Sequence, residues 1–320
     1  MLIKRKVISA FVTIALLILT ASQLLAAAAG APNPVSMDAS ADPGATLEAM
    51  AQQKFGAALT AAERKLLHAA PLRDVPWFGP NDDPDNAAND TAHGEKWGAE
   101  RTVRAEVVSW LLADQSASQY VHPSGLALAG ARIAGSLDLS YATVGKPLTL
   151  IRCYVPDGIN LLSAHTQDIT VRRSRTGPVL GNLANIHGDA SFLMGDFGPI
   201  SFMRARIDGT LDFSGARILN VTDDAVNLVE ANIDGDVLFQ EGFTTDGIVY
   251  ARLAKIGHDL SFHGAEFKRD GNSTPSAPPL PAPSTGLTSS IRRRRCSTSR
   301  MRTPALSGTT RRAGRRPATW

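Results

Sequence analysis

The sequence predicts a mainly β protein whose body is a parallel β-helix with a helical cap at its N-terminal end. Three observations support this fold class. An apolar-any-apolar pattern returns about every 11 residues between 126 and 267, a small residue stands at the same place in almost every unit, and helical periodicity is confined to residues before 126. Many short strands at regular spacing with one crowded inward position are typical of a solenoid, in which each coil buries its face on its neighbours.

The first 29 residues predict a signal peptide or a membrane anchor of bacterial type. Three basic residues, Lys4 to Lys6, precede an apolar run from Val7 to Leu25, and small residues suited to cleavage follow it. The run is also long enough to span a bilayer, which takes about 20 residues. In both interpretations the basic flank stays in the cytoplasm, so the protein is expected to be exported and to be periplasmic, secreted or anchored in the membrane.

Residues 30–44 are interpreted as a spacer, and residues 45–125 as a helical region with a long polar loop. A capping box formed by Thr60 and Glu63 predicts the start of one helix, because each of the two side chains satisfies a free backbone N–H of the first turn. A second amphipathic helix is predicted over Glu100–Asp114.

This second helix is expected to cover the first coil of the β-helix, because a solenoid has open ends whose unpaired strand edges invite aggregation. Trp110 lies on its apolar face. Glu100 and Arg104, four residues apart, are expected to form an ion pair on its surface.

Thirteen units of the repeating pattern cover residues 126–267. They begin at Leu126, Leu137, Leu148, Ile159, Ile169, Val179, Ala190, Ile200, Leu211, Val226, Val237, Ile248 and Leu260. Two consecutive units make a coil of about 21–22 residues, which predicts six to seven coils. One longer step, of 15 residues before Val226, predicts a loop over Asn220–Asp224 that is pushed out of the wall.

The sixth residue of each unit is small in twelve of the thirteen units. The thirteen residues are Ala131, Ala142, Cys153, Ala164, Ser174, Ala184, Gly195, Ala205, Ala216, Ala231, Gly242, Leu253 and Ala265. The position must therefore point into a confined interior near a corner. Cys153 occupies one of these positions, so it is interpreted as a small buried thiol and not as a redox-active one.

Two kinds of segment in the repeat carry a resemblance to known proteins. Ala184–Ile186 and Ala231–Ile233 resemble the Ala-(Asp/Asn)-Leu core of bacterial pentapeptide-repeat proteins. The pattern Ile-x-Gly-x-Leu-x-Leu/Phe at Ile133–Leu139, Ile207–Phe213 and Ile233–Phe239 is similar to a divergent exported or membrane-associated group of such proteins, whose function is unknown. The resemblance covers about 140 residues. It implies a right-handed, four-sided β-helix and no particular activity.

Residues 268–320 are predicted to be a disordered tail rich in Pro and Arg. From residue 271 on, the chain has ten arginines and no acidic residue, whereas residues 1–270 have 23 basic and 30 acidic side chains. The folded body is therefore acidic, and a nucleic-acid partner is not expected. Two interpretations of the tail stay open. One is a native basic arm that binds anionic lipid or envelope polymer, and the other is a shifted reading frame that replaces the continuation of the β-helix.

The turns before alternate units carry acidic residues and histidines that are expected to stack along one corner. They are His187, Asp189, Asp208, Asp234, Asp236, His258 and Asp259. At about 4.8 Å per coil, such a ladder predicts a site for calcium, which takes oxygen ligands, or for a glycan. The alternative is a purely local one, since Asp and Gly favour turns.

Catalysis is not predicted by the remaining polar residues. The acidic loop from Asn81 to His93 lacks the spacing of an EF-hand. An enzyme needs acids and bases that converge on one wall, but the outward acids Asp138 and Asp212 belong to coils far apart, and no nucleophile elbow, P-loop or nucleotide fingerprint occurs. No cofactor is expected apart from the possible calcium ion.

The sequence thus favours a non-catalytic exported scaffold or interaction protein that presents an acidic β-helix wall to an unknown protein or to an envelope polymer. The alternative is a carbohydrate-binding or carbohydrate-active β-helix protein that uses the Asp/His ladder. A third hypothesis, a cytoplasmic mimic of DNA, is disfavoured by the apolar N-terminal segment.

Overall fold

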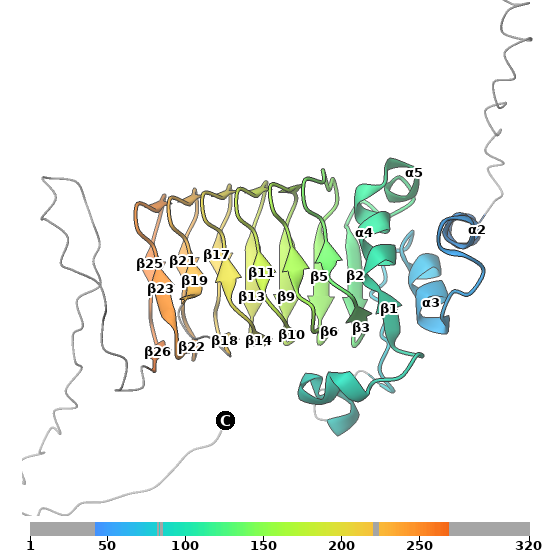
Figure 1. Ribbon diagram of the computed structural model, residues 1–320, viewed down its shortest axis with the longest axis horizontal. Coiled ribbons are helices and arrows are strands. Elements are labelled where there is room, and N and C mark those ends of the chain that lie inside the picture. The colour runs from blue at the N-terminus through green and yellow to red at the C-terminus, as the bar shows by residue number, and fades with distance from the viewer. Residues whose placement is uncertain (1–41, 82, 84–85, 220–223, 269–320) are drawn as a thin grey trace, which may run out of the picture. The chain divides into compact units, whose positions relative to one another are not determined.

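The computed structural model describes residues 42–81, 83, 86–219 and 224–268 (Figure 1). They form a parallel β-solenoid of about six turns with helices at its N-terminal end, so the predicted fold class is confirmed. The predicted export segment, almost all of the spacer and the Arg-rich tail lie outside the described residues. Within them, no helix is long and apolar enough to cross a membrane.

Four parallel sheets, A to D, form the walls, and each coil passes through them in that order. Sheet A contains β2 (Leu126–Ala129), β5 (Leu148–Ile151), β9 (Ile169–Arg172), β13 (Ala190–Leu193), β17 (Leu211–Asp212), β21 (Val237–Leu238) and β25 (Leu260–Ser261). Sheet B contains β1 (Thr102–Arg104), β3 (Arg132–Ala134), β6 (Tyr154–Val155), β10 (Arg175–Thr176), β14 (Asp196–Phe197), β18 (Arg217–Ile218), β22 (Thr244–Thr245) and β26 (Glu266–Phe267). Sheet C contains β4 (Leu137–Asp138), β7 (Ile159–Asn160), β11 (Val179–Leu180), β15 (Ile200–Ser201), β19 (Asp224–Asn227) and β23 (Ile248–Tyr250). Sheet D contains β8 (His165–Thr166), β12 (Asn185–Ile186), β16 (Arg206–Ile207), β20 (Asn232–Ile233) and β24 (Lys255–Ile256).

Equivalent residues of successive coils pair in register, which is why the sequence repeats. In sheet A, Leu126 pairs with Leu148, and Leu148 with Ile169. The units found in the sequence fall alternately on sheets A and C, so the prediction of two units per coil is confirmed. The predicted loop Asn220–Asp224 lies outside the described residues except for Asp224, which is the first residue of β19.

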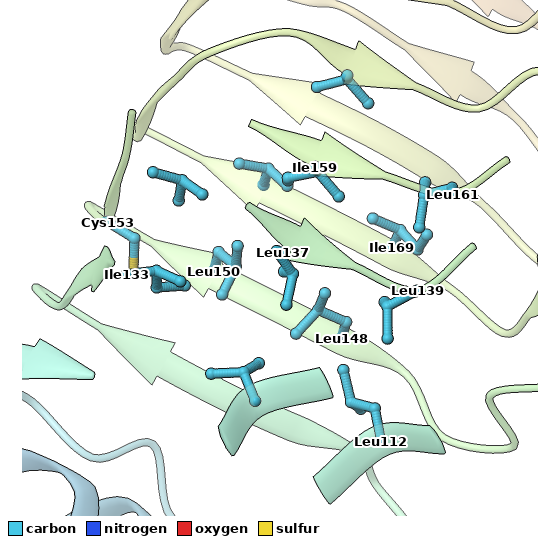
Figure 2. Close-up of a cluster of buried hydrophobic side chains, with 14 of the residues drawn as sticks. Leu112, Ile133, Leu137, Leu139, Leu148, Leu150, Cys153, Ile159, Leu161 and Ile169 are labelled. Carbon is cyan, nitrogen blue, oxygen red and sulfur yellow. The ribbon is translucent and has the colours of Figure 1, made fainter. Parts of the chain in front are cut away.

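Apolar side chains fill the space between the walls of the first coils. Figure 2 shows Leu137 and Ile159 of sheet C facing Leu148 and Ile169 of sheet A, with Leu112 from the helical cap beside them. All five are at most 2% exposed. Burial of apolar area of this kind, at about 25 cal/mol per Å², is the main force that holds the coils together.

In the later coils, phenylalanine side chains fill much of the core. The rings of Phe192, Phe213, Phe239 and Phe262 stack along sheet A, with successive centroid distances of 5.9, 5.0 and 5.3 Å. Aromatic pairs at such distances add attraction beyond the area that they bury. The aromatic column ties four coils together.

One unit of the repeat starts one residue later than predicted. Val226 pairs with Val249 and not with Ile248, because a bulge shifts the register between β19 and β23. Ala254 therefore stands at the small inward position, and Leu253 is 61% exposed. Leu253 is therefore not an exception to the rule of small residues. The unit was assigned one residue too early, because Ile248 and Val249 are both apolar and either could be its first residue.

A true exception lies in the preceding unit. Thr244 pairs with Arg217, which sets Phe243 beside Ala216 in the column of small residues and makes Gly242 an inserted residue. Phe243 is fully buried, with its ring 4.9 Å from that of Phe239. The large side chain is accommodated because it joins the aromatic core of these coils.

Helices close the N-terminal end of the solenoid (Figure 1). They are α2 (Pro43–Phe55), α3 (Ala61–Ala69), the short 3₁₀ helices η1 (Ala87–Asn89) and η2 (Thr91–Lys96), α4 (Ala105–Ala113) and α5 (Gln115–Ser118). The capping box of Thr60 and Glu63 is present as predicted. Helix α4 contacts β4 of the first coil, so the predicted capping role is confirmed.

The capping helix begins later than expected, and its predicted surface ion pair is wrong. Thr102–Arg104 form β1, which extends sheet B by pairing with β3, so α4 starts at Ala105. Arg104 does not pair with Glu100. Its Nε donates to Oε1 of Glu63 at 2.6 Å, and its Nη2 donates to Oε2 of the same carboxylate at 3.0 Å.

Candidate functional site

The structure brings all seven residues of the predicted ladder to one corner, between sheets D and A. Strands β12, β16 and β20 pair in register, so the residues that follow them, His187, Asp208 and Asp234, form one column. Asp189, Asp236 and Asp259 precede strands of sheet A and form a second column. His258 lies between the columns, at a place that glycine occupies in the three preceding coils. We call these two columns the D–A corner.

The first column is a chain of side-chain contacts at the surface. His187 Nδ1 lies 3.2 Å from Asp208 Oδ2, and Arg206 Nε lies 2.9 Å from Asp208 Oδ1. The same guanidinium reaches Asp234 Oδ2 through Nη2 at 2.5 Å. Arg206 was not among the predicted residues, because its position within a strand gave no sign that it bridges two coils. Its charge offsets that of two carboxylates, which would otherwise repel each other.

The second column uses its carboxylates to lock successive coils together. Asp189 Oδ1 accepts a hydrogen bond from Thr210 N at 2.7 Å, and Asp236 Oδ1 accepts one from Asp259 N at 2.8 Å. Asp168, which the sequence analysis missed, does the same for Asp189 N at 2.8 Å. These hydrogen bonds join residues of neighbouring coils, 21 to 23 positions apart, and are not the purely local turn contacts of the alternative explanation.

Glycine is required where these carboxylates fold over the backbone. A Cβ at Gly188 would lie 2.0 Å from Oδ1 of Asp168, and a Cβ at Gly209 would lie 2.2 Å from Oδ1 of Asp189. Both distances are far below van der Waals contact. The repeated Asp and Gly of this corner therefore act together, because the glycine leaves room for the carboxylate that bonds to the next coil.

The D–A corner is thus a polar surface and not a ready coordination sphere. Among the residues that the structure describes, no group of three or more His, Cys, Asp or Glu side chains is arranged to hold a metal ion. Asp208 and Asp234 keep side chains that are 35% and 45% exposed. Their carboxylates remain available for hydrogen bonds to hydroxyl, amide or ammonium groups of a partner.

The other acidic candidates serve local structure. Asp90 Oδ1 accepts a hydrogen bond from Ala92 N at the start of η2, and its Oδ2 lies 3.3 Å from Nδ1 of His93. Asp138 and Asp212 stand on different walls, sheets C and A, as strand ends β4 and β17. Each accepts a hydrogen bond from the backbone N–H two residues later, which is the usual use of Asp in a turn.

Cys153 is a buried free thiol, as the sequence predicts. It is 0% exposed, and burial raises the pKa of its thiol to about 12. A thiol reacts as its thiolate, so this one is protonated and shielded at neutral pH. The other cysteine of the chain, Cys296, lies outside the described residues.

The described structure is a parallel β-solenoid of about six turns, a form compatible with a pentapeptide-repeat-like β-helix. Comparisons with protein-family models, with curated proteins and with solved structures find no match to this chain.

Proposed function

We propose that the protein is a non-catalytic exported scaffold that presents the acidic D–A corner to another macromolecule, either a protein or an envelope polymer. The observation that carries this proposal is the extent of the corner. Exposed carboxylates recur over successive coils, from Asp189 to Asp259, on a wall whose strands pair from coil to coil. A rigid, repetitive surface suits an extended partner, because little conformational entropy is lost when it binds.

The assignment to a repeat class belongs to the same proposal. The inward small residue, the inward Ile, Val, Phe or Thr two residues later and the four-sided coil favour a divergent pentapeptide-repeat-like β-helix. The proposed export rests on the N-terminal residues 1–29, where a basic start precedes an apolar run.

A second candidate function, glycan binding, is favoured by the first column of the D–A corner. Exposed carboxylates beside the Arg206 guanidinium offer both acceptors and donors, which sugar hydroxyl groups can use at once. A calcium ion held by additional groups of the glycan would strengthen such binding.

One binding experiment tests both candidates. The full chain is compared with the double variant Asp208→Asn/Asp234→Asn, which removes charge from the corner while the side chains keep their shape. Asp196→Asn on sheet B is the matched control, since Asp196 also pairs with an arginine, at 2.6 Å. Each protein is titrated against neutral and acidic envelope glycans, with and without calcium, and against basic peptides.

The scaffold proposal predicts binding of a basic peptide or polymer that weakens at least tenfold in the double variant and hardly changes in Asp196→Asn. Calcium-dependent binding of a glycan with the same sensitivity would replace the scaffold by the glycan function. Equal binding by all three proteins would exclude the corner, and degradation of any glycan would contradict the non-catalytic assignment.

A further inference from the structure

A pocket of about 450 Å³ lies in the segment between α3 and β1, outside the D–A corner. Its lining includes Phe78, His93, Lys96, Trp97, Glu100 and Arg101. Pockets of this size commonly hold small ligands. The lining combines aromatic rings with three side chains that can carry positive charge.

The most unusual member of the lining is a buried arginine. Arg101 is 5% exposed and stacks on the Trp97 ring, with its guanidinium carbon 3.6 Å from the ring centroid. Its Nε donates to the carbonyl of Gly130 at 2.9 Å, and its Nη1 donates to that of Ala88 at 2.7 Å. Among the described residues no carboxylate forms an ion pair with it, and its Nη2 has no hydrogen-bond partner. The charge of Glu100 favours the protonated guanidinium, but Glu100 forms no ion pair with it. An anion in the pocket would add to the compensation of this buried charge.

Two other unpartnered polar atoms lie behind Gly79, on residues that do not themselves line the pocket. They are Oδ1 of Asn89, a residue that is 3% exposed, and Nε1 of Trp77. A Cβ at Gly79, which lines the pocket, would lie 2.3 Å from the first atom and 2.8 Å from the second. A Cβ at Gly130 would lie 3.3 Å from Arg101 Nη2. Donors and an acceptor without partners thus lie buried behind the lining of the pocket, whereas buried polar groups are nearly always satisfied.

We propose that this pocket binds a small sugar acid, with its carboxylate held by Arg101 and Lys96. A hydroxylated ligand also suits the acceptor of the site, because its hydroxyl groups can donate to the Glu100 carboxylate. The rings of Phe78 and Trp97 supply apolar surface for the sugar ring. Because Nη2 is itself buried, its contact with the ligand requires a small shift of the lining side chains.

The charge pattern favours a carboxylate over a phosphate. Only one nitrogen of the guanidinium is left without a partner, and the Glu100 carboxylate at the same pocket repels a doubly charged group. His93 is exposed and already pairs with Asp90, so Arg101 and Lys96 remain to balance a single negative charge.

The test is calorimetric titration of the full chain with galacturonate, galactose and inorganic phosphate. Galacturonate is expected to bind and galactose is not, and Lys96→Ala is expected to weaken galacturonate binding about tenfold, the typical effect of losing a hydrogen bond to a charged group. Arg101→Gln is expected to abolish measurable binding. Lys255→Ala, on exposed β24 at the other end of the solenoid, is the matched control and should bind as the parent chain does.

The lysine variant keeps the proposal testable if Arg101→Gln fails to fold, because Lys96 is an exposed side chain. Absence of galacturonate binding in the parent chain would overturn the proposal. Equal binding of galactose would overturn the role of the carboxylate, and tighter binding of phosphate would overturn the sugar acid. Galacturonate binding that is as tight in Lys96→Ala as in the parent chain would place the ligand elsewhere. Failure here leaves the D–A corner untouched, since the two sites share no residue.

Discussion

Substitution of Glu63 by glutamine is expected to loosen the whole helical cap. Glu63 is 0% exposed, and its carboxylate accepts hydrogen bonds from four donors, one of which is the backbone N of Arg104 at 3.2 Å. The other three donors are Thr60 N at 2.9 Å, Arg104 Nε at 2.6 Å and Arg104 Nη2 at 3.0 Å. Arg104 in turn stands 5.5 Å from the centroid of the Phe55 ring in α2. One carboxylate therefore connects α3 with β1, the strand that extends sheet B.

The expected loss of stability follows from the partial burial of the ion pair between Glu63 and Arg104. Breaking a buried ion pair by removing one partner costs about 3–5 kcal/mol. Because the Arg104 side chain is 34% exposed, water recovers part of this loss, and we expect about 2–3 kcal/mol. Glutamine still fits the capping box, so the loss reports the ion pair and not the helix cap. The midpoint of thermal unfolding should fall by about 5–10 °C.

Urea and thermal unfolding of the full chain, followed by circular dichroism, measure the effect. Glu100→Gln is the matched control, because Glu100 stands four residues before Arg104 and was the partner expected from the sequence. The control should change the free energy of unfolding by less than about 0.5 kcal/mol. An equal loss in both variants, or no loss in Glu63→Gln, would refute the reasoning.

The loss of stability in Glu63→Gln is expected to depend on pH. Burial alone would raise the pKa of Glu63, but the hydrogen bonds from Arg104 and Thr60 outweigh it and hold that pKa below its usual value. A depressed folded-state pKa gives stability that is complete above the unfolded-state pKa and is lost as the pH falls through the folded-state pKa. The difference between the parent chain and Glu63→Gln should therefore be largest near neutral pH and shrink in acid.

Two further predictions concern the core. Phe243→Ala should destabilise the solenoid by about 3–5 kcal/mol, the usual cost of deleting a buried ring, whereas Phe267→Ala, at a residue that is 47% exposed, should cost much less in the same urea titration. Cys153, with a pKa of about 12 and no exposure, should resist iodoacetamide in the folded protein and react in urea at pH 9. Rapid labelling of the Cys153 peptide under native conditions, seen by mass spectrometry, would show that the coil around it opens.

Local sequence rules predicted the elements whose cause is local. The capping box of Thr60 and Glu63 involves residues three apart, and Asp and Gly mark where the turns of the D–A corner fall. The hydrogen bonds of those Asp side chains, however, reach the next coil, 21 to 23 residues away. Rules of this kind cannot detect the ion pair between Glu63 and Arg104, because these residues are 41 positions apart in the sequence. They therefore assigned Arg104 to its helical neighbour Glu100, because only pairs three or four residues apart are visible to them.

The same limit explains the residues missed at the two candidate sites. Arg206 has the charge of a solvent-facing strand residue, and only the stacking of coils sets it between Asp208 and Asp234. Arg101 has the composition of a surface residue in a polar loop, yet the structure buries it against Gly130 of the first coil. Burial of a charged side chain is a property of the packing and leaves no periodic trace in the sequence.

The sequence by itself determined that this protein is a capped parallel β-solenoid with two units per coil, because a repeat that must bury itself on its own copies imposes one pattern on every coil. Only the tertiary structure decided the register where two apolar residues stand side by side, as at Ile248 and Val249, because either choice satisfies the pattern and the bulge in sheet C selects one. It also decided which charges meet across coils and which arginine is buried, since those contacts depend on distances in space and not along the chain.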